Sequence, residues 1–253
     1  MSGRSRVALV AGGSGGLGGA VCRALARDGW DIALTYNSRR DAAEKVVRQL
    51  GAQGVNAHAF GVDLRDAGAV LDVVERAGAA IPLSGLVYAS GPYIPLKYIS
   101  QQEPAVFSEV VDADLKACYS LLHAAIPQLR QTAGRVAAVV TPAIDRYAPK
   151  DILSSAPKAG IQAIIRGIAS EEGRHGVRAN AVGVGVIKGD GMWSQLIERG
   201  DYTEAMLDAA RNNTALRRFG SVDDIGEAVA FLMSDHAGWV TGQTLNVDGG
   251  YSI

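Results

Sequence analysis

Short apolar runs of strand length alternate along the chain with longer segments whose apolar residues recur every three to four positions. The short runs predict β-strands at 6–11, 31–36, 55–60, 84–89, 135–140, 177–182 and 244–247. The periodic segments predict helices at 20–27, 41–50, 66–78, 104–131, 155–172 and 222–233, with a loop at 142–153 and an irregular to helical stretch at 188–220. Strands that alternate with helices of this length pair in parallel through right-handed crossovers. The pattern therefore predicts an α/β fold: a doubly wound parallel sheet of about seven strands, with helices on both faces.

No linker, repeat or low-complexity tract divides the sequence, so residues 1–253 are expected to form a single domain. Ligands of such sheets bind beyond the carboxyl ends of the strands. The segments that follow the predicted strands are rich in glycine, small polar residues and charges, and they are 12–18, 37–40, 63, 90–91, 141 and 183–189. We expect them to converge on one cleft.

The first strand leads through a glycine-rich turn directly into a helix. Gly12 can turn tightly, Gly16 can let the backbone approach a pyrophosphate, and Gly18 can let the helix pack close to the strand. Free N–H groups at the start of the helix then face the anion. The turn therefore predicts a dinucleotide site, with a merely mobile glycine loop as the alternative. The residues concerned are Gly12, Gly13, Ser14, Gly15, Gly16, Leu17 and Gly18.

Composition excludes several classes of partner. The 253 residues carry a net charge of −1 with interspersed signs, so no basic stripe favours nucleic acid or an anionic membrane. No apolar run approaches the roughly 20 residues needed to span a bilayer. Cys22 and Cys118 both lie in apolar helical patterns, and no signal peptide is recognised, which favours buried thiols and a cytoplasmic location. The four histidines lack ligand spacing, so no metal site is expected.

Motifs spread over nearly the whole chain resemble those of the short-chain dehydrogenase/reductases. Residues 11–18 are similar to the family's Thr-Gly-x-x-x-Gly-Ile-Gly, Asp63-Leu64 to its adenine-contacting pair, and Tyr88-Ala-Ser-Gly91 stands where Asn-Asn-Ala-Gly is usual. The tail segments 218–220, 240–242 and 246–250 resemble the closing part of the single-domain members, such as the 3-oxoacyl-carrier-protein reductases. The resemblance implies a Rossmann-type fold, a homo-oligomer (tetramer or dimer), and further cofactor contacts at Asp63, Leu64, Ala89, Ser90, Gly91 and Ile187.

The catalytic positions depart from the family pattern of Tyr-x-x-x-Lys with a Ser thirteen residues before the Tyr. Lys158 fits the lysine, which in the family holds the nicotinamide ribose, although a solvated lysine is the alternative. Ser154 stands at the tyrosine position and Thr141 at the serine position. Thr141 is expected either to polarise a substrate carbonyl or simply to end a strand. Ser154 is expected to be the N-cap of a helix with Pro157 in its first turn, or a proton relay.

The proton donor is consequently open. Reducing a ketone needs a hydride and a proton, general acid catalysis contributes roughly 10²–10⁴-fold, and a serine hydroxyl is a poor acid. Asp114 occupies the place of the family's helix-borne Asn. It can form a water-bridged ion pair with Lys158, act as acid or base if burial raises its pKa, or be a plain isosteric replacement. Phenols in nearby loops are further candidates, in the order Tyr147, Tyr93 and Tyr202.

The segment 35–40 indicates which nicotinamide cofactor is bound. No acid precedes Asp41, whereas Asn37, Ser38 and Arg39 or Arg40 can bind a 2′-phosphate, which favours NADP(H). The alternative is that both arginines are solvated. Residues 188–213 are expected to form a substrate lid, in which Met192, Trp193 and Tyr202 suggest an apolar ligand or ordinary core packing.

These features predict an NADPH-dependent carbonyl reductase with a non-standard proton donor, acting on a small molecule such as a polyketide, a quinone or another activated ketone. Lys158 positions the cofactor, Thr141 polarises the carbonyl, and the proton comes through Asp114, Ser154 and water or from Tyr147. Two other hypotheses use the same scaffold. One is a lyase or isomerase with Asp114 as base, and the other is a cofactor-binding protein without catalysis.

Overall fold

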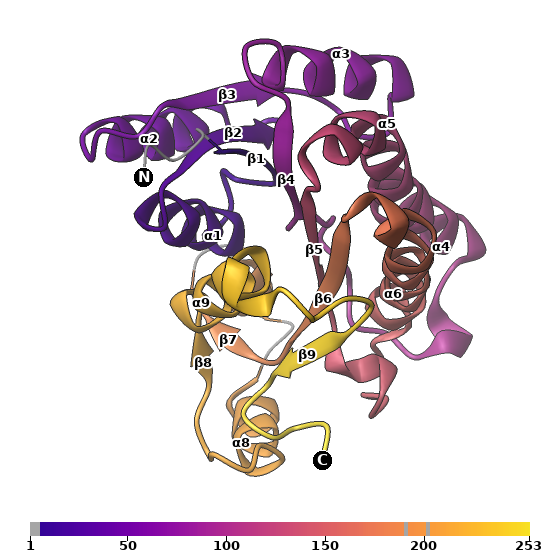
Figure 1. Ribbon diagram of the computed structural model, residues 1–253. Helices are drawn as coiled ribbons and strands as arrows, with labels where there is room; N and C mark the ends of the chain where they lie inside the picture. The colour runs from indigo at the N-terminus through magenta and orange to yellow at the C-terminus, as the bar shows by residue number, and fades with distance from the viewer. Residues whose placement is uncertain (1–5, 190–191, 201–202) are drawn as a thin grey trace.

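The protein is built on one parallel sheet of seven strands in the order β3-β2-β1-β4-β5-β6-β9 (Figure 1). The computed structural model describes residues 6–189, 192–200 and 203–253. The strands are β1 (Arg6–Ala11), β2 (Trp30–Tyr36), β3 (Ala57–Gly61), β4 (Leu83–Tyr88), β5 (Arg135–Val140), β6 (Arg178–Val184) and β9 (Thr244–Val247). The predicted doubly wound α/β fold is confirmed. Its strand order reverses between β1 and β4, where a sheet of this type opens a crevice for ligands.

Helices cover both faces of the sheet (Figure 1). On one face lie α1 (Gly16–Arg27), α2 (Arg40–Gly51) and α9 (Val222–Met233). On the other lie α3 (Ala67–Ala77), α5 (Ala117–Thr132) and α6 (Ile152–Glu172). Each face has its own apolar core, one containing Trp30 and the other Tyr88, and both side chains are buried. Within the described ranges no helix is long and apolar enough to cross a membrane.

The helix expected at 104–131 is not uniform. It begins as α4 (Pro104–Val110), widens into a π-helical turn at Val111–Lys116, and continues as α5. Such turns occur often at functional sites, because the extra residue changes the direction in which the side chains point. Here the π-helical turn carries Asp114, which is only 2% exposed.

The predicted start of the helix at residue 155 is wrong. Helix α6 begins at Ile152, after Asp151, whose carbonyl oxygen accepts from the N–H groups of Ser154 and Ser155 at 3.0 and 2.8 Å. Ser154 therefore lies inside the first turn and is not the N-cap. Pro157 lies beyond the first turn rather than within it. Two serines close to a proline suggested a later start than the chain adopts.

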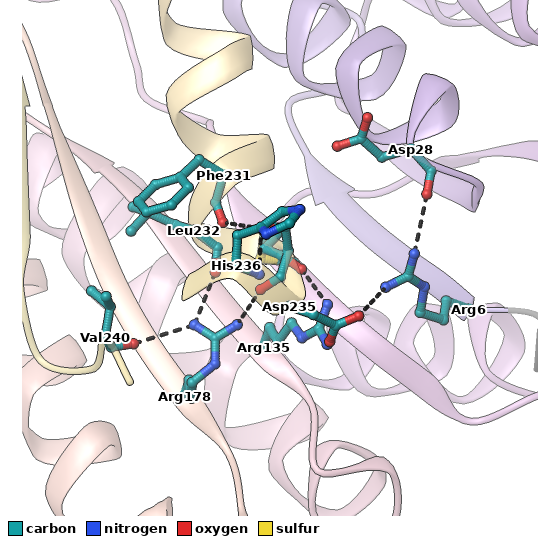
Figure 2. Close-up of polar contacts among 11 residues, drawn as sticks. Arg6, Asp28, Arg135, Arg178, Phe231, Leu232, Asp235, His236 and Val240 are labelled. Carbon is teal, nitrogen blue, oxygen red and sulfur yellow. Dashed lines mark hydrogen bonds and ion pairs between the residues drawn. The ribbon is translucent and has the colours of Figure 1, made fainter. Parts of the chain in front are cut away.

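Arginines at the end of the sheet opposite the glycine turn fix the C-terminal end of α9 (Figure 2). The guanidinium of Arg178 on β6 donates at 3.0, 2.9 and 3.2 Å to the carbonyl oxygens of Leu232, Ser234 and Val240. Arg135 on β5 pairs with Asp235. The bonds to Leu232 and Ser234 satisfy carbonyl groups that a helix end leaves without partners. The bond to Val240 holds the segment that leads to β9. Burial and the nearby charge of Arg135 lower the pKa of Arg178.

Candidate functional site

The glycine turn between β1 and α1 adopts a shape that side chains would prevent. Gly12 has a φ of +75°, and a Cβ there would lie 2.8 Å from the carbonyl oxygen of Ala89. A Cβ on Gly18 would lie 2.2 Å from the carbonyl oxygen of Gly12. The tight turn at Gly12 and the close helix–strand packing at Gly18 are therefore confirmed. The result is a helix N-terminus open to a ligand at the edge of the sheet.

A cavity of about 350 Å³ lies beyond the carboxyl ends of β1, β2 and β4. The residues predicted from the sequence that line it are Gly12, Ser14, Asn37, Ser38, Arg39, Asp63, Leu64, Ser90 and Gly91. The structure adds Thr35, Tyr36, Val62, Arg65, Pro92 and Ala113, which sequence reasoning missed. The other residues of the glycine turn, namely Gly13, Gly15, Gly16, Leu17 and Gly18, are not in its lining. Ile187 lines a second cavity of about 240 Å³, and Ala89 belongs to neither lining.

Arg39 is the cation available at this cavity. Its guanidinium lies 3.3 Å from the position of a Cβ on Gly15, so it reaches the glycine turn. Among the residues that the structure describes, Arg39 forms no ion pair, whereas Arg40 is bonded to Glu44 at 2.7 Å. Arg40 is thus engaged on the outer surface of α2, whereas Arg39 lines the cavity where an anion would lie.

The predicted adenine contact, Asp63, is held by a residue that the sequence analysis did not single out. The Arg65 guanidinium donates to both carboxylate oxygens of Asp63, with the closest contact at 2.5 Å. These bonds and the Arg65 N–H group lower the pKa of the Asp63 carboxyl. The short spacing between Asp63 and Arg65 in the sequence could have indicated this ion pair.

Lys158 on α6 reaches across to the end of β4. Its Nζ donates to Asp114 Oδ1 at 2.9 Å and to the carbonyl oxygen of Ser90 at 3.3 Å. A Cβ on Gly91 would lie 3.8 Å from the same Nζ. The ammonium group therefore lies beside Gly91, which lines the cavity. Its pair with Asp114 is direct rather than bridged by water.

Tyr88 is the third member of a buried cluster with Lys158 and Asp114. Its one hydroxyl hydrogen is shared between Asp114 Oδ1 at 3.1 Å and the Asp114 carbonyl oxygen at 3.0 Å, and its ring lies 5.3 Å from Lys158 Nζ. Burial and the charge of Asp114 raise the pKa of Tyr88 well above its usual range. The phenol therefore stays protonated and serves as a donor to the carboxylate. Sequence reasoning quoted Tyr88 as a motif position but assigned it no such contact.

Asp151 is a second residue that sequence reasoning missed. It precedes α6, but its side chain bonds to no N–H group of the helix start. The carboxyl instead interacts with the hydroxyl of Ser154, which favours the charged form, while burial acts more strongly and raises the pKa of Asp151 to about 7. Placing the helix start correctly would have exposed the spacing of Asp151, Ser154 and Lys158.

Thr141 ends β5 at the same edge of the sheet. Its Oγ1 accepts from the N–H of Ala143 at 3.2 Å and so caps a short 3₁₀ turn at Pro142–Ile144. A hydroxyl keeps one hydrogen to donate when its oxygen accepts. Thr141 can therefore both end the strand and donate to a ligand.

A family model described as enoyl-(acyl carrier protein) reductase matches residues 11–252 of this chain. The chain belongs to the short-chain dehydrogenase/reductase family. It is 30% identical over 254 residues to the 3-oxoacyl-(acyl-carrier-protein) reductase FabG of Staphylococcus aureus. The alignment covers 97% of this chain and 98% of that protein. The chain is 28% identical over 250 residues to versicolorin reductase stcU of Emericella nidulans, with 97% of this chain and 95% of that protein covered.

The solved structures agree with this assignment. A blue fluorescent protein from a metagenomic library, crystallised in complex with NADPH, matches with a TM-score of 0.88 and 30% identity over 98% of each chain. The family resemblance seen in the motifs is therefore confirmed, and so is the single-domain Rossmann fold. The protein is an oxidoreductase of this family.

The other phenols proposed for this short-chain dehydrogenase/reductase differ in their surroundings. Tyr147 is 47% exposed on the loop after β5. The ring of Tyr93 lies under the guanidinium of Arg199, 4.1 Å from its centroid. Tyr202 lies outside the described residues. Tyr251 in the C-terminal tail was not among the phenols proposed; its hydroxyl donates to the carbonyl oxygen of Arg146 at 3.3 Å.

The stretch expected to form a lid contains α7 (Met192–Glu198) and α8 (Glu204–Asn212). Leu196 and Leu207 are buried, and the ring of Trp193 lies 5.2 Å from that of Phe219. These contacts support the packing interpretation of the apolar residues in this stretch.

The two thiols of this short-chain dehydrogenase/reductase are as buried as the sequence predicted. Burial raises the pKa of Cys22 to about 12 and raises that of Cys118 as well. A thiol with so high a pKa forms almost no thiolate at neutral pH. Neither cysteine is therefore a reactive group of the site.

Proposed function

We propose that this protein is an NADPH-dependent carbonyl reductase whose proton comes from a group other than a tyrosine four residues before the lysine. The observation that carries the proposal is the position of Lys158, whose ammonium is fixed by Asp114 and the Ser90 carbonyl at the Gly91 rim of the cavity. A cation held there is placed to bind the hydroxyl groups of a nicotinamide ribose.

The cavity residues fit a phosphorylated nicotinamide dinucleotide. Gly12, Gly15 and Gly16 carry no side chain at the N-terminus of α1, and Arg39 supplies a cation beside them. In this proposal the pyrophosphate lies along 12–18, and Asn37, Ser38 and Arg39 hold the 2′-phosphate. Adenine lies against Asp63 and Leu64, and the nicotinamide half meets Ala89, Ser90, Gly91, Lys158 and Ile187. When bound, the cofactor supplies a hydride to the carbonyl carbon of the substrate.

In this proposal, side chains of the protein bind the substrate oxygen, hold Lys158 and deliver the proton. Thr141 donates a hydrogen bond to the substrate oxygen, since its hydrogen is not used by the Ala143 contact. Asp114 holds Lys158 and accepts from Tyr88, so it acts as a fixed charge and not as the acid. Ser154 lies one helical turn before Lys158 and takes the proton relay. Tyr147 stays the alternative phenol, on an exposed loop.

An activated ketone is the substrate class that this site suits best. A quinone or a polyketide carries electron-withdrawing groups or acidic phenols of its own, and so it needs less help from a protein acid. Two relatives at 28–30% identity are named as reductases of a 3-oxoacyl carrier protein and of versicolorin. We propose residues 188–213 as the lid that closes over this substrate.

Cofactor binding and consumption test the proposal separately. Calorimetry should show NADPH binding, and absorbance at 340 nm should fall when a panel of quinones and polyketide-like ketones is added. Lys158→Met should lower turnover at least 100-fold, while Lys116→Met on the outer surface should leave it unchanged. Product formation without NADPH consumption would favour a lyase or isomerase instead. NADPH binding without any turnover would favour a binding protein.

A further inference from the structure

Two segments of the cavity lining carry charged side chains. The segment after β2 brings Arg39, and the segment after β3, residues 62–65, brings Asp63 and Arg65, which pair with each other. The other side chains of this second segment, Val62 and Leu64, are apolar and pack on the core of the sheet. Apolar surface beside a few fixed polar groups is typical of a site that orients a flat ring through hydrogen bonds.

The backbone after β3 decides how Asp63 and Arg65 meet. Residues 63–66 form a turn that is closed by a bond from the N–H of Asp66 to the carbonyl oxygen of Asp63 at 3.0 Å, and α3 starts directly after it. The Asp63 carboxylate accepts from the N–H of Arg65 at 3.0 Å, a contact that aspartate commonly makes with the residue two positions on. The turn therefore brings the Arg65 side chain back to the carboxylate.

These contacts leave one acceptor position on the carboxylate. Oδ1 accepts from the N–H of Arg65 and from its Nε at 2.9 Å, which uses both lone pairs of that oxygen. Oδ2 accepts from Arg65 Nη2 at 2.5 Å, and its contact with Nε at 3.0 Å shares the hydrogen that Oδ1 already receives. Oδ2 therefore keeps one lone pair for a ligand, and the Asp63 side chain is 38% exposed. Because Arg65 lowers the pKa of this carboxyl, it stays ionised at neutral pH and can only accept.

Arg65 faces carboxylates, whereas Arg39 does not. The hydrogen bonds and the charge of Asp63 raise the pKa of Arg65 most, and the charges of Asp112 and Glu109 raise it further. Glu109 lies on α4, and Asp112 lies on the π-helical turn that follows it. A guanidinium whose charge is already balanced by carboxylates offers a phosphate group little further attraction. Arg65 is therefore placed to hold Asp63 and not to bind a phosphate.

We propose that Arg65 is a positioning residue that makes this cavity specific for a dinucleotide whose base carries an amino group. The inference rests on the proposed function, in which the base lies against Asp63 and Leu64. Held by Arg65, Asp63 Oδ2 accepts one N–H bond from the 6-amino group of the base. A 6-oxo base such as hypoxanthine places a carbonyl oxygen at that point, and two acceptors that face each other repel. Arg65 acts only through Asp63, whose carboxylate loses its fixed orientation when the two-point contact is removed.

Calorimetric titration with NADPH and with its hypoxanthine analogue measures the base preference. The wild type should bind NADPH about tenfold more tightly or better, as expected for a hydrogen bond to a charged group. Arg65→Met should reduce this ratio to less than about threefold, while the ratio of NADPH to NADH affinity stays within about twofold of the wild type. Arg65→Lys keeps the charge but not the two-point contact, so it should also lose most of the base preference.

Asp63→Ala tests whether Arg65 acts through Asp63. Hypoxanthine also carries a hydrogen on N1, so the variants, and not the wild-type ratio alone, assign the effect to the carboxylate. Asp63→Ala should lose the base preference to the same extent as Arg65→Met, and the double variant should lose no more. Arg76→Met is the matched control, because Arg76 pairs with Asp72 at 3.1 Å on α3 and its side chain is 62% exposed, against 60% for Arg65. It should keep the wild-type ratio.

Two results would overturn the assignment of Arg65 and leave the proposed function standing. One is a wild-type chain that binds both nucleotides equally while it reduces ketones with NADPH. The other is an Arg65→Met variant that binds both nucleotides equally less tightly, which would mean that Arg65 contacts a part that the two share. A base preference that depends on Arg65, in a chain that reduces no ketone, would support the assignment while the proposed reductase activity fails. A wild-type chain that binds neither nucleotide would end both.

Discussion

At the scale of single residues, the site differs from its surroundings in how its charges are held. Lys158 and Asp114 form a direct ion pair with side chains only 12% and 3% exposed. Breaking a buried pair leaves one charge without compensation, which costs more than losing a pair in solvent. The contrast can be measured, because the π-helical turn that carries Asp114 also carries an exposed pair of the same residue types, Asp112 and Lys116.

We expect Asp114→Asn to lower the free energy of unfolding by about 3 kcal/mol, because it leaves the largely buried Lys158 without its partner carboxylate. Asp112→Asn is the control: Asp112 pairs with Lys116 at 2.7 Å in solvent, and its loss should cost less than about 1 kcal/mol. Urea unfolding of the three chains measures both values. Equal losses would mean that the Lys158–Asp114 pair is as well solvated as the exposed one.

Cofactor preference is decided by Arg39 if the proposed function holds. Arg39→Ser should weaken NADPH binding at least tenfold and leave NADH binding nearly unchanged, because only NADPH carries the 2′-phosphate. Arg40→Ser removes the same charge one residue away, where Glu44 already holds it at 2.7 Å, and should change neither affinity. Calorimetric titration with both nucleotides is the measurement. A matching loss in the two variants would contradict the assignment of Arg39.

At the scale of elements, the close packing of α1 on β1 depends on one glycine. Gly18→Ala places a Cβ 2.2 Å from the Gly12 carbonyl oxygen, so the helix must shift away from the turn. We expect weaker NADPH binding by at least tenfold and a lower melting temperature. Gly167→Ala on α6 is the control, since a Cβ there meets nothing within 4 Å and should stabilise the helix by up to about 1 kcal/mol.

The elements also show where sequence reasoning succeeded and where it did not. The strand–turn–helix at 6–27 follows from local sequence alone, because glycine spacing and apolar runs act over a few residues. The start of α6 does not, because Ser155 and Pro157 suggested an N-terminus three residues after the true one. That displacement hid Asp151, which directly precedes the true start of α6. The Tyr88–Asp114 contact joins residues 26 positions apart and needs the fold.

At the scale of the whole molecule, β9 forms an edge of the sheet, and large apolar side chains on β9, on α9 and in the segment before β9 are exposed to solvent. Trp239 is fully exposed, and Phe231 on α9 and Leu245 on β9 are 44% and 39% exposed. An apolar surface and an unpaired strand edge of this kind favour contact with another chain. We therefore propose that the protein is a homo-oligomer that uses this edge.

Trp239→Glu should shift the protein toward a smaller species, because a charge replaces the most exposed aromatic side chain at that edge. Light scattering coupled to size exclusion measures the mass of both chains. Tyr119→Glu on α5, where the side chain is 57% exposed on a different surface, separates an effect of this edge from a general effect of added charge. A wild-type mass equal to that of one chain would contradict the proposal.

The cluster of Lys158, Asp114 and Tyr88 has a consequence for the choice of substrate. The ammonium and the carboxylate cancel, and the phenol stays uncharged, so the cluster has no net charge at neutral pH. An anionic keto acid would gain no long-range attraction from it and would still lose its hydration on entering. If the proposed function holds, we therefore expect ketones that bear no carboxylate to be reduced in preference to keto acids.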